Sequence, residues 1–552
     1  MPGCTTAGYT LHTCEKCGDS YRDSEVPPTG HQTAEGVTPC LSHSCTVCGA
    51  DFAEPHDSIT ENVAATCQHA GYTSYTCTRC GDSYKEETAP RTDHVYASDD
   101  PCYLQECIFC GHGELPTHDL QLVAVIRPAT LVHEGEGDFI CRLCEKEFRK
   151  PIAIAEPEGF GTPILYFEGS LSGISKENEG QLLLRYVSED LTFSGAATLK
   201  VQGASSSGFP KKNYTMKLYE DATFAKRKKI DPFGWGKESK YCLKANYIDF
   251  SQARNVVSGR LFGDVVRSRV GVNPRLLSAP NGGAVDGEPV LVYVNGEYHG
   301  FYTMNIPKDE WMFGIKSKEG GQQAILFVDD WTESGALNEP IAADYANGWK
   351  VEYCSTEDDS WVRESFNNMM AFLQNHDGSA LRNGLRSYLD VDAAIDHMLF
   401  IYLICGQDNL SKNTLWVTYD GRLWIPSVYD MDGTWGLYWH GQSYYEVDRT
   451  VPRLRSDGSV DAKANNLLWK KLFRYYREEV KARYEELRRD AMSNGAITLR
   501  FDEFFDSVPP EFYAAEREKW YEVPSQTTNN RDQIITFMKA RMKRLDAFFA
   551  SL

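Results

Sequence analysis

The residues best suited to chemistry lie between positions 406 and 432. Asp408 is followed by Asn413 after four spacer residues, Asp430 comes seventeen positions later, and Asp432 stands two residues beyond it. Phosphoryl transfer needs a carboxylate to orient the acceptor hydroxyl and oxygen ligands to hold a divalent ion on the phosphates. The four side chains are candidates for such a site, and the plainer interpretation is a capped turn.

The elements expected around these residues favour the first interpretation. A helix is predicted over "HMLFIYLICGQ", just before Asp408, and a hairpin over "NTLWVTYDG" and "LWIPSV", between Asn413 and Asp430. Protein kinases have the same order of elements in their catalytic and metal-binding segments: a helix, an Asp-x4-Asn loop, a hairpin and an aspartate.

A second segment offers groups that could hold phosphate. The Gly/Ser loop in "VQGASSSGFPKKNYTMKLYE", which includes Ser206, lies between two predicted strands, and such loops let backbone N–H groups approach phosphates. Lys217 follows in the second strand, and Lys244 lies on the strand "KYCLKANY". Either lysine could be the phosphate anchor, and alternation along the strand does not decide between them. The alternatives are an ordinary hairpin turn and solvated strand lysines.

The order of elements predicts an α+β fold with two lobes. Residues 151–162 are rich in Pro and Gly and read as a linker. Strand-like runs predominate over about 163–310, where Asn295-Gly296 indicates a hairpin, and helical patterns predominate over about 311–552. We therefore expect one bilobal domain over 163–552.

Four stretches of this domain resemble the CotH kinase family, the atypical kinases named for a bacterial spore-coat protein. They are "GASSSGFPKKNYTMKL", "CLKANYIDFSQARNVVSGRLF", "VYVNGEYHGFYTM" and "DNLSKNTLWVTYDGRLWIPSVYDMDGTWG". The resemblance covers roughly residues 160–550. It implies a divergent protein-kinase-like fold that binds ATP with Mg²⁺ or Mn²⁺ and phosphorylates Ser or Thr of secreted or coat proteins.

The resemblance also implies roles for particular residues. Asp408 corresponds to the catalytic-loop aspartate, Asn413 to the residue that assists the metal, and Asp430 to its principal ligand, with Asp432 as a further ligand. Trp424 falls where the family places an aromatic near adenine, and the alternative is a half-buried strand tryptophan. One departure is "TMNIPKDEW": Asn305 and Ile306 stand where many relatives carry a glutamate after the hairpin, and the nearest acids are Asp309 and Glu310.

Residues 1–150 form an array of small cysteine-rich repeats. Fourteen of the 17 cysteines lie before residue 145, and Cys-x-x-Cys recurs five times. Long and short repeats alternate, with approximate bounds 1–35, 36–62, 63–97, 98–122 and 123–150. The last is degenerate, because Leu131 stands where a first cysteine is expected and no histidine follows Cys144 in the matching place.

Each complete repeat offers three cysteines and one histidine, which is a tetrahedral zinc set. The spacing predicts zinc-ribbon-like modules with structural Zn²⁺, and disulfides between repeats are the alternative. The predicted ligand sets are Cys4, Cys14, Cys17 and His31; Cys40, Cys45, Cys48 and His56; Cys67, Cys77, Cys80 and His94; and Cys102, Cys107, Cys110 and His118.

Composition and the array together suggest location and partners. A net charge of −21 argues against general nucleic-acid binding, and no apolar run is long enough to span a bilayer. The array resembles cysteine-rich repeats in surface proteins of anaerobic Gram-positive bacteria. We expect a secreted or cell-surface protein that acts on a Ser/Thr-containing protein, although the chain has no signal peptide. The rival hypothesis is a non-catalytic surface protein whose repeats or head bind a cell-surface or host partner.

Overall fold

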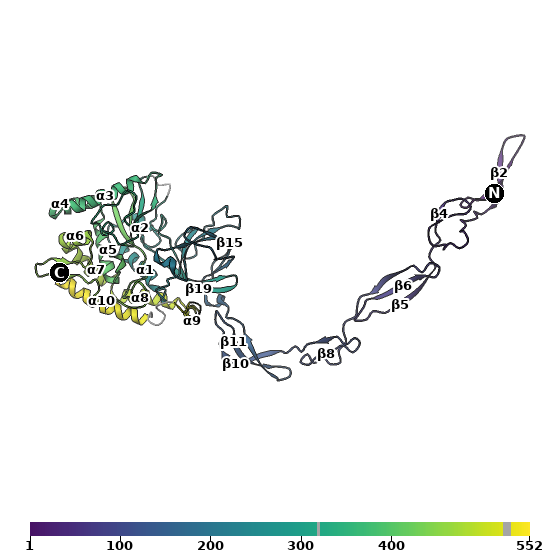
Figure 1. Ribbon diagram of the computed structural model, residues 1–552, viewed down its shortest axis with the longest axis horizontal. Helices are drawn as coiled ribbons and strands as arrows, with labels where there is room; N and C mark the ends of the chain where they lie inside the picture. The colour runs from purple at the N-terminus through teal and green to yellow at the C-terminus, as the bar shows by residue number, and fades with distance from the viewer. Residues whose placement is uncertain (317–320, 523–530) are drawn as a thin grey trace. The chain divides into compact units, whose positions relative to one another are not determined.

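The computed structural model describes three stretches of the chain, residues 1–316, 321–522 and 531–552 (Figure 1). Over these stretches the chain folds as two compact units. No described helix combines the length and the apolar character that a membrane span requires.

The division between the units falls inside the predicted fifth repeat. One unit holds Met1–Val125 and Gly137–Lys150, and the other holds Ile126–Glu136 and Pro151–Leu552. Leu131, the residue in place of a cysteine, is 2% exposed and belongs to the large hydrophobic cluster of the second unit. An apolar side chain at this position contributes to that core, where a metal-binding thiol would not.

The repeats consist of short strands in small separate sheets, ordered β1-β2, β3-β4, β5-β6-β7, β8-β9 and β10-β11-β12. Their bounds are β1 (Gly8–Thr13), β2 (Ser20–Val26), β3 (His43–Ser44), β4 (Asp51–Phe52), β5 (Ser58–Val63), β6 (Gly71–Cys77), β7 (Ser83–Ala89), β8 (Gln105–Glu106), β9 (Gly113–Glu114), β10 (Leu120–Arg127), β11 (Gly135–Cys141) and β12 (Glu147–Ile152). Sheets this small bury little apolar surface, so another source of stability is needed.

Each Cys-x-x-Cys pair lies at the turn of a hairpin. In the third repeat, the Gly81 N–H donates to the Cys77 carbonyl at 2.9 Å and Gly81 has a φ of 74°. Glycine adopts this left-handed conformation without steric cost, which explains the Cys-x-x-Cys-Gly pattern of the first four repeats. The degenerate fifth repeat places Glu145 there, at a φ of 59°.

A closed barrel forms the first part of the second unit, with strand order β13-β14-β15-β16-β17-β19-β18. The strands are β13 (Ile164–Glu168), β14 (Gly180–Val187), β15 (Thr192–Gln202), β16 (Asn213–Tyr219), β17 (Lys240–Lys244), β18 (Gly287–Val294) and β19 (Glu297–Asn305). The barrel closes where β13 pairs in parallel with β18. Alternate side chains of the strands point into the barrel and fill it. In β16 these are Tyr214, Met216 and Leu218, and their neighbours along the strand are less buried.

The predicted turn at Asn295-Gly296 is confirmed. Both residues have positive φ, 51° and 82°, and they join β18 to β19 with Val294 opposite Glu297. Two consecutive residues of positive φ are the requirement of a type I′ turn, whose twist matches that of the paired strands.

Beyond the barrel lie the helices and a second, antiparallel sheet of order β21-β20-β22-β23. The helices are α1 (Ala253–Arg267), α2 (Pro274–Ser278), α3 (Ser360–Asn375), α4 (Gly378–Gly384), α5 (Val391–Ile404), α6 (Leu467–Tyr475), α7 (Arg477–Arg489), α8 (Asn494–Asp506), α9 (Pro510–Lys519) and α10 (Arg531–Ser551). The remaining strands are β20 (Ala324–Val328), β21 (Trp349–Cys354), β22 (Thr414–Thr418), β23 (Trp424–Val428), β24 (Arg453–Leu454) and β25 (Val460–Asp461). Single-turn 3-10 helices are η1 (Pro157–Phe160), η2 (Ser205–Gly208), η3 (Leu385–Ser387) and η4 (Asp408–Leu410).

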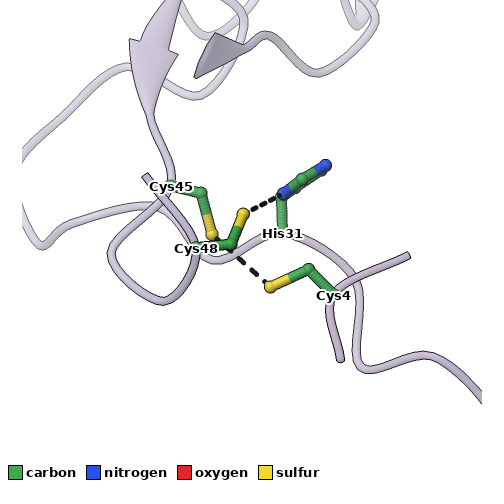
Figure 2. A group of neighbouring side chains, drawn as sticks. All are labelled: Cys4, His31, Cys45 and Cys48. Carbon is green, nitrogen blue, oxygen red and sulfur yellow. Dashed lines mark hydrogen bonds between the residues drawn. The ribbon is translucent and has the colours of Figure 1, made fainter. Parts of the chain in front are cut away.

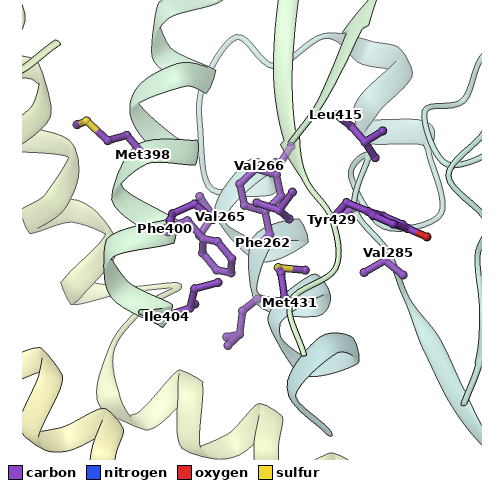
Figure 3. Close-up of a cluster of buried hydrophobic side chains, with 14 of the residues drawn as sticks. Phe262, Val265, Val266, Val285, Met398, Phe400, Ile404, Leu415, Tyr429 and Met431 are labelled. Carbon is purple, nitrogen blue, oxygen red and sulfur yellow. The ribbon is translucent and has the colours of Figure 1, made fainter. Parts of the chain in front are cut away.

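Helices α1 and α5 form the centre of this core. All residues of α5 except Asp392 are buried, as expected of a helix that is apolar on every side. Phe262 of α1 and Phe400 of α5 meet edge to face, with ring centroids 5.1 Å apart (Figure 3). Tyr429 and Met431 belong to the same cluster, so the core fixes the residues on both sides of Asp430.

Candidate functional site

A cavity of about 390 Å³ in the second unit collects most of the residues predicted to do chemistry. Its lining includes Asp408, Asn413, Asp430, Asp432, Lys244 and Ser206. The barrel side supplies the lysine and the serine, and the loops around the second sheet supply the carboxylates and the amide. Segments separated by about 200 positions in sequence therefore meet at one site.

The loop that carries Asp408 and Asn413 is fixed at both ends. It begins after Cys405, a left-handed residue that ends α5, and Asp408 starts η4. The Asn413 N–H donates to the Val328 carbonyl of β20 at 2.7 Å. The Asn409 amide donates to the Tyr429 carbonyl at 2.8 Å, which joins this loop to the segment that follows β23.

The Asp430 loop is fixed by the first turn of α1. The Met431 N–H donates to Asn255 Oδ1 at 3.0 Å, and Arg254 Nε donates to the Thr434 carbonyl at 3.0 Å. Arg254 is itself buried and forms a 2.6 Å ion pair with Asp249. The sequence placed Arg254 and Asn255 in a helix, but it did not show that their side chains hold this loop.

Negative charge accumulates at the base of the cavity. Burial raises the pKa of Asp432 well above its ordinary value, and the nearby carboxylates of Asp430, Asp249 and Asp408 raise it further, against the opposing effect of Lys244. Several carboxylates beside one amide oxygen are the ligands that Mg²⁺ and Mn²⁺ prefer. A divalent cation would neutralise this cluster, so the residues fit the predicted metal.

Lys244 is the cation that faces these carboxylates. Burial opposes its charge, but Tyr429, Asp430 and Asp432 raise its pKa above the usual value for lysine. Its ammonium lies 5.3 Å from the centre of the Tyr429 ring. Lys244 is therefore charged and placed where an anionic ligand of the cavity would meet it.

Lys217 and Trp424 lie away from the cavity. Lys217 points outward from β16, opposite to its buried neighbours, and pairs with Glu179 at 3.0 Å. Trp424 is fully buried, donates from Nε1 to Ser365 at 3.1 Å and packs edge to face on Phe366. Both residues were predicted from the sequence to bind nucleotide, but strand alternation and core packing direct their side chains away from the cavity.

The cavity has further lining residues that sequence reasoning missed. Lys412 pairs with Asp408 at 3.1 Å. Asp329 lies at the end of β20, and Trp331 and Trp439 are 44% and 54% exposed although both line the cavity. Exposed tryptophans at a polar cavity are unusual, but no pattern in the sequence separates them from core tryptophans.

A second hollow of about 390 Å³ shares Ser206, Lys244, Asn413 and Asp430 with the first. Its lining also includes the apolar and aromatic side chains of Val201, Phe327 and Tyr429, together with Lys176, Lys308 and Lys350. The Phe327 and Tyr429 rings meet edge to face with centroids 5.5 Å apart. Aromatic and apolar surface flanked by lysines suits a ligand with a flat apolar part and an anionic part.

The cysteines and histidines of the repeats form four clusters. They are Cys4, His31, Cys45 and Cys48; Cys40, His56, Cys77 and Cys80; Cys67, His94, Cys107 and Cys110; and Cys102, His118, Cys141 and Cys144. Within each cluster the possible ligand atoms all lie within 4.8 Å of one another. Figure 2 shows the first cluster, in which the four side chains point toward a common centre.

The spacing inside the clusters matches tetrahedral zinc. One sulfur pair in each cluster is separated by 3.5 to 3.9 Å, and one sulfur lies 3.3 to 3.5 Å from histidine Nδ1. Two Zn–S bonds of about 2.3 Å at the tetrahedral angle separate their sulfurs by about 3.8 Å, whereas a disulfide needs about 2.05 Å. All 17 cysteines are free in this structure.

The surroundings of one thiol in the first cluster, Cys45, favour the thiolate form that a metal needs, whereas burial and the neighbouring Cys45 and Cys48 raise the pKa of Cys4 to about 11. Burial alone would raise the pKa of Cys45, but backbone N–H groups of Gln32, Cys48 and Val47 lower it to about 5. Two of these donors lie 3.3 and 3.4 Å from the sulfur. The Cys/His groups could therefore hold a metal ion such as zinc.

The predicted grouping of ligands within single repeats is wrong. Each cluster takes the first cysteine and the histidine of one repeat, which we name the donor half, and the Cys-x-x-Cys pair of the next repeat, which we name the acceptor half. Cys141 and Cys144, absent from the predicted sets, belong to the fourth cluster, whereas Cys14 and Cys17 are in none of the four clusters. Each pair lies at a hairpin turn and meets the first cysteine and the histidine of the preceding repeat, not those of its own repeat.

Comparison with models of protein families gives a match within the second unit. A family model described as CotH kinase protein matches residues 199–545, which is more than half of the chain. The match includes every described residue of the cavity named above. No curated protein matches the chain.

Proposed function

The chain belongs to the CotH kinase protein family, and we propose that residues 163–552 are a divergent, bilobal protein-kinase-like domain. The domain uses ATP with Mg²⁺ or Mn²⁺ and phosphorylates Ser or Thr of a secreted or surface protein. The family match supports a kinase-like function, and the resemblance of its motifs supports the nucleotide and the class of acceptor.

One observation carries the proposal: Asp408, Asn413, Asp430 and Lys244 line the same cavity. Phosphoryl transfer depends on positioning and charge stabilisation, so the residues must converge, whatever their spacing in the sequence. An ordinary capped turn would not place a buried lysine from β17 opposite three carboxylates.

In this mechanism Asp408 accepts the proton of the acceptor hydroxyl. The hydroxyl oxygen bonds to the γ-phosphorus, the bond to the bridging oxygen breaks, and ADP leaves. Lys244 and the backbone N–H groups around Ser206 bind phosphate oxygens, while Lys412 holds Asp408 in place. Asn413, Asp430 and Asp432 would hold the divalent cation, which neutralises charge on the transferring phosphoryl group.

We place adenine in the second hollow. Val201, Phe327 and Tyr429 supply apolar and aromatic surface there, next to the shared Lys244. A planar base fits such surface, and the phosphates then extend into the acidic cavity. This position replaces the stacking on Trp424 that the resemblance implied, because Trp424 is buried in the core.

The test compares wild type with Asp430→Asn and Asp408→Asn in incubation with γ-labelled ATP and Mn²⁺. Both variants keep the size of the side chain and are expected to lose at least about 100-fold in label transfer, the order of a lost preorganised group. The matched control is Asp506→Asn, at the exposed end of α8. Equal labelling of wild type and Asp430→Asn would refute the assignment of the metal ligand.

A second candidate function is a non-catalytic surface protein with a kinase-like head. Among the described residues Lys244 forms no ion pair, and the nearest acid of the divergent segment, Asp309, pairs with Lys240 at 2.9 Å. A kinase lysine ordinarily pairs with a glutamate when active. Nucleotide binding by calorimetry without any phosphate transfer would favour this candidate.

For residues 1–150 we propose four structural Zn²⁺ ions that join consecutive repeats outside the cell. All four ligands come from protein, so the sites have no open position for catalysis. A spacer or adhesive role fits closed sites. Metal analysis of the purified chain should find four zinc ions, and disulfides in their place would refute the proposal.

A further inference from the structure

The cavity around Asp408 has a part that the nucleotide does not need. The lining that it shares with the second hollow, where we place ATP, includes Ser206, Lys244, Asn413 and Asp430. Asp408 lines the first cavity but not the second hollow. Because the acceptor hydroxyl must reach Asp408 to lose its proton, the acceptor occupies the unshared part of the cavity. The side chains that line this part therefore determine which acceptors fit.

Aromatic side chains are concentrated in the unshared part. Its lining includes Trp331, Trp439, Phe209 and Tyr247. All 11 tryptophans lie in the described stretches, and only Trp331 and Trp439 are exposed, at 44% and 54%. A ligand that covers exposed aromatic surface gains free energy, because that surface leaves water. Both exposed tryptophans of the protein thus lie at one cavity, beside the residue that meets the acceptor.

The turn that carries Trp439 is held against the cavity. The Tyr438 N–H donates to the Ser443 carbonyl at 2.9 Å, and the Gly441 N–H donates to the Tyr438 carbonyl at 2.7 Å. Gly441 has a φ of 75° and lies close to the backbone of Ile248, another lining residue. An added Cβ at Gly441 would lie 2.6 Å from the Ile248 carbonyl oxygen. A larger residue there would push the turn, and Trp439 with it, away from the cavity.

Phe209 and Tyr247 form a second aromatic surface of the same cavity. Their rings stack with centroids 4.8 Å apart and an interplanar angle of 24°. Phe209 follows η2 in the Gly/Ser loop, and Tyr247 follows β17, the strand that carries Lys244. Because the two rings already pack on each other, a planar group that packs on them costs little side-chain entropy.

The charged side chains of the cavity are engaged and do not select the acceptor. Asp329 pairs with Lys350, and Asp408 pairs with Lys412 at 3.1 Å. The other lining carboxylates are the proposed metal ligands, and the other lining lysine is the proposed phosphate anchor. Among the described lining residues, no carboxylate is therefore left for a basic residue of the acceptor, and no ammonium group is left for an acidic one.

The side-chain amides of the unshared part are also engaged, which argues against a sugar as the acceptor. Each donates to another group of the protein: Asn213 to Ser206 Oγ at 3.3 Å, Asn246 to Gln252 Oε1 at 2.8 Å, and Asn409 to the Tyr429 carbonyl at 2.8 Å. A sugar that stacks on tryptophan also needs polar partners for its hydroxyl groups, because a buried hydroxyl without a hydrogen bond is costly. An aromatic hydrocarbon ring has no such requirement.

We propose that Trp331, Trp439 and the Phe209–Tyr247 pair select protein acceptors with an aromatic residue within about two positions of the phosphorylated Ser or Thr. Two residues of extended chain span about 7 Å, so one cavity can hold both side chains. The aromatic side chain packs on these rings while the neighbouring hydroxyl reaches Asp408. This selection rests on the proposed function, because it requires that Asp408 meets the acceptor.

The test compares four short peptides with one central Ser. They differ only in the residue on either side of the Ser, which is Phe, Leu, Lys or Glu. The full chain phosphorylates them with γ-labelled ATP and Mn²⁺, and initial rates give kcat and KM. We expect kcat/KM for the Phe peptide to exceed the values for the Lys and Glu peptides about tenfold and that for the Leu peptide about threefold, since stacking of rings adds to burial.

The double variant Trp331→Ala/Trp439→Ala should raise KM for the Phe peptide about tenfold and leave kcat within about twofold, because the rings contribute to binding and not to the chemical step. For the Lys peptide both constants should stay within about twofold. Trp331→Phe/Trp439→Phe should keep most of the preference, because aromatic rings remain. The matched control is Leu499→Ala, which removes an exposed apolar side chain from α8 and should behave as wild type.

Acrylamide quenching of tryptophan fluorescence is measured alongside, because it reports on exposed indoles whether or not phosphate is transferred. The Phe peptide should protect wild type from quenching more than the Lys peptide does.

Equal kcat/KM for all four peptides would overturn the proposed selection, as would a preference that survives the double Ala variant. Protection from quenching by an oligosaccharide such as cellotriose, and not by the Phe peptide, would also overturn it. Transfer to none of the peptides would instead refute the proposed function, and the quenching result would then decide alone whether the aromatic surface binds aromatic peptides.

Discussion

At the scale of single residues, the candidate site depends on backbone conformations that residues other than glycine seldom adopt. Asn413 and Asp430 both have a φ of 53°, in the left-handed region. Such residues cost about 1 kcal/mol or more and persist only where the surroundings determine them. Two hydrogen bonds hold these conformations in place. The Asn413 N–H donates to the Val328 carbonyl, and the Met431 N–H donates to Asn255 Oδ1.

Lys244 and Lys217 make a matched pair for experiment. Both are strand lysines that the sequence could not separate, but only Lys244 lines the cavity. Lys244→Ala should reduce phosphate transfer at least about 100-fold, because a buried cation opposite the metal ligands acts on the transferring charge. Lys217→Ala should leave the rate within about twofold, since an exposed ion pair with Glu179 contributes little.

Initial rates with labelled ATP measure both variants. Unfolding monitored by circular dichroism is the control, because Lys244 is buried and its loss could lower stability as well as activity. A larger loss of rate in Lys217→Ala than in Lys244→Ala would contradict the placement of the phosphate anchor.

The sequence could indicate Asp408, Asn413, Asp430 and Asp432 because they lie close together in the chain, around one hairpin. It could not indicate which lysine or tryptophan joins them. That choice depends on which face of β16 meets the barrel interior and on how Trp424 packs on Phe366. The role of Asn255 could not be predicted for the same reason, because its hydrogen bond with Met431 joins residues 176 positions apart in the sequence.

At the scale of elements, local signals predicted hairpins and the long apolar helix α5. The closure of the barrel was not predictable from them. Its last contact pairs β13 with β18 in parallel, and the two strands are separated by more than 100 residues. Short apolar strands such as β20 are also ambiguous alone, and they become strands by pairing with β21 and β22.

One buried ion pair joins helix α9 to the barrel. Lys211, just before β16, donates to Glu516 of α9 at 2.5 Å and to the Phe301 carbonyl, and both side chains are almost fully buried. The second Glu516 oxygen accepts from the Phe301 N–H at 2.9 Å. The pair is therefore satisfied by hydrogen bonds on both sides, which a buried pair requires.

Glu516→Ala should lower the free energy of unfolding of the second unit by about 3 to 5 kcal/mol, because it leaves the buried Lys211 ammonium without its partner. The double variant Lys211→Met/Glu516→Leu should recover much of the loss, since no charge is then buried. Urea denaturation followed by tryptophan fluorescence measures both. A single variant as stable as wild type would show that α9 is not held by this pair.

At the scale of the whole molecule, the metal clusters explain how repeats with so little core can be ordered. Each repeat shares one Cys/His cluster with the repeat before it and one with the repeat after it, except at the two ends of the series. Binding at one junction therefore orders parts of two hairpins. A metal site of this kind can contribute on the order of 10 kcal/mol to folding. That is more stabilisation than the small apolar surface buried by these sheets can supply.

Two double variants distinguish sharing between repeats from the grouping within repeats that spacing alone suggested. In the shared arrangement, Cys14→Ser/Cys17→Ser leaves four zinc ions in the chain, because neither cysteine is in a cluster. Cys141→Ser/Cys144→Ser removes one ion, because both belong to the fourth cluster. Grouping within repeats predicts the reverse, with a loss from the first variant and none from the second. Native mass spectrometry counts the ions directly, and since both variants lose two thiols, general weakening of metal binding would affect them equally.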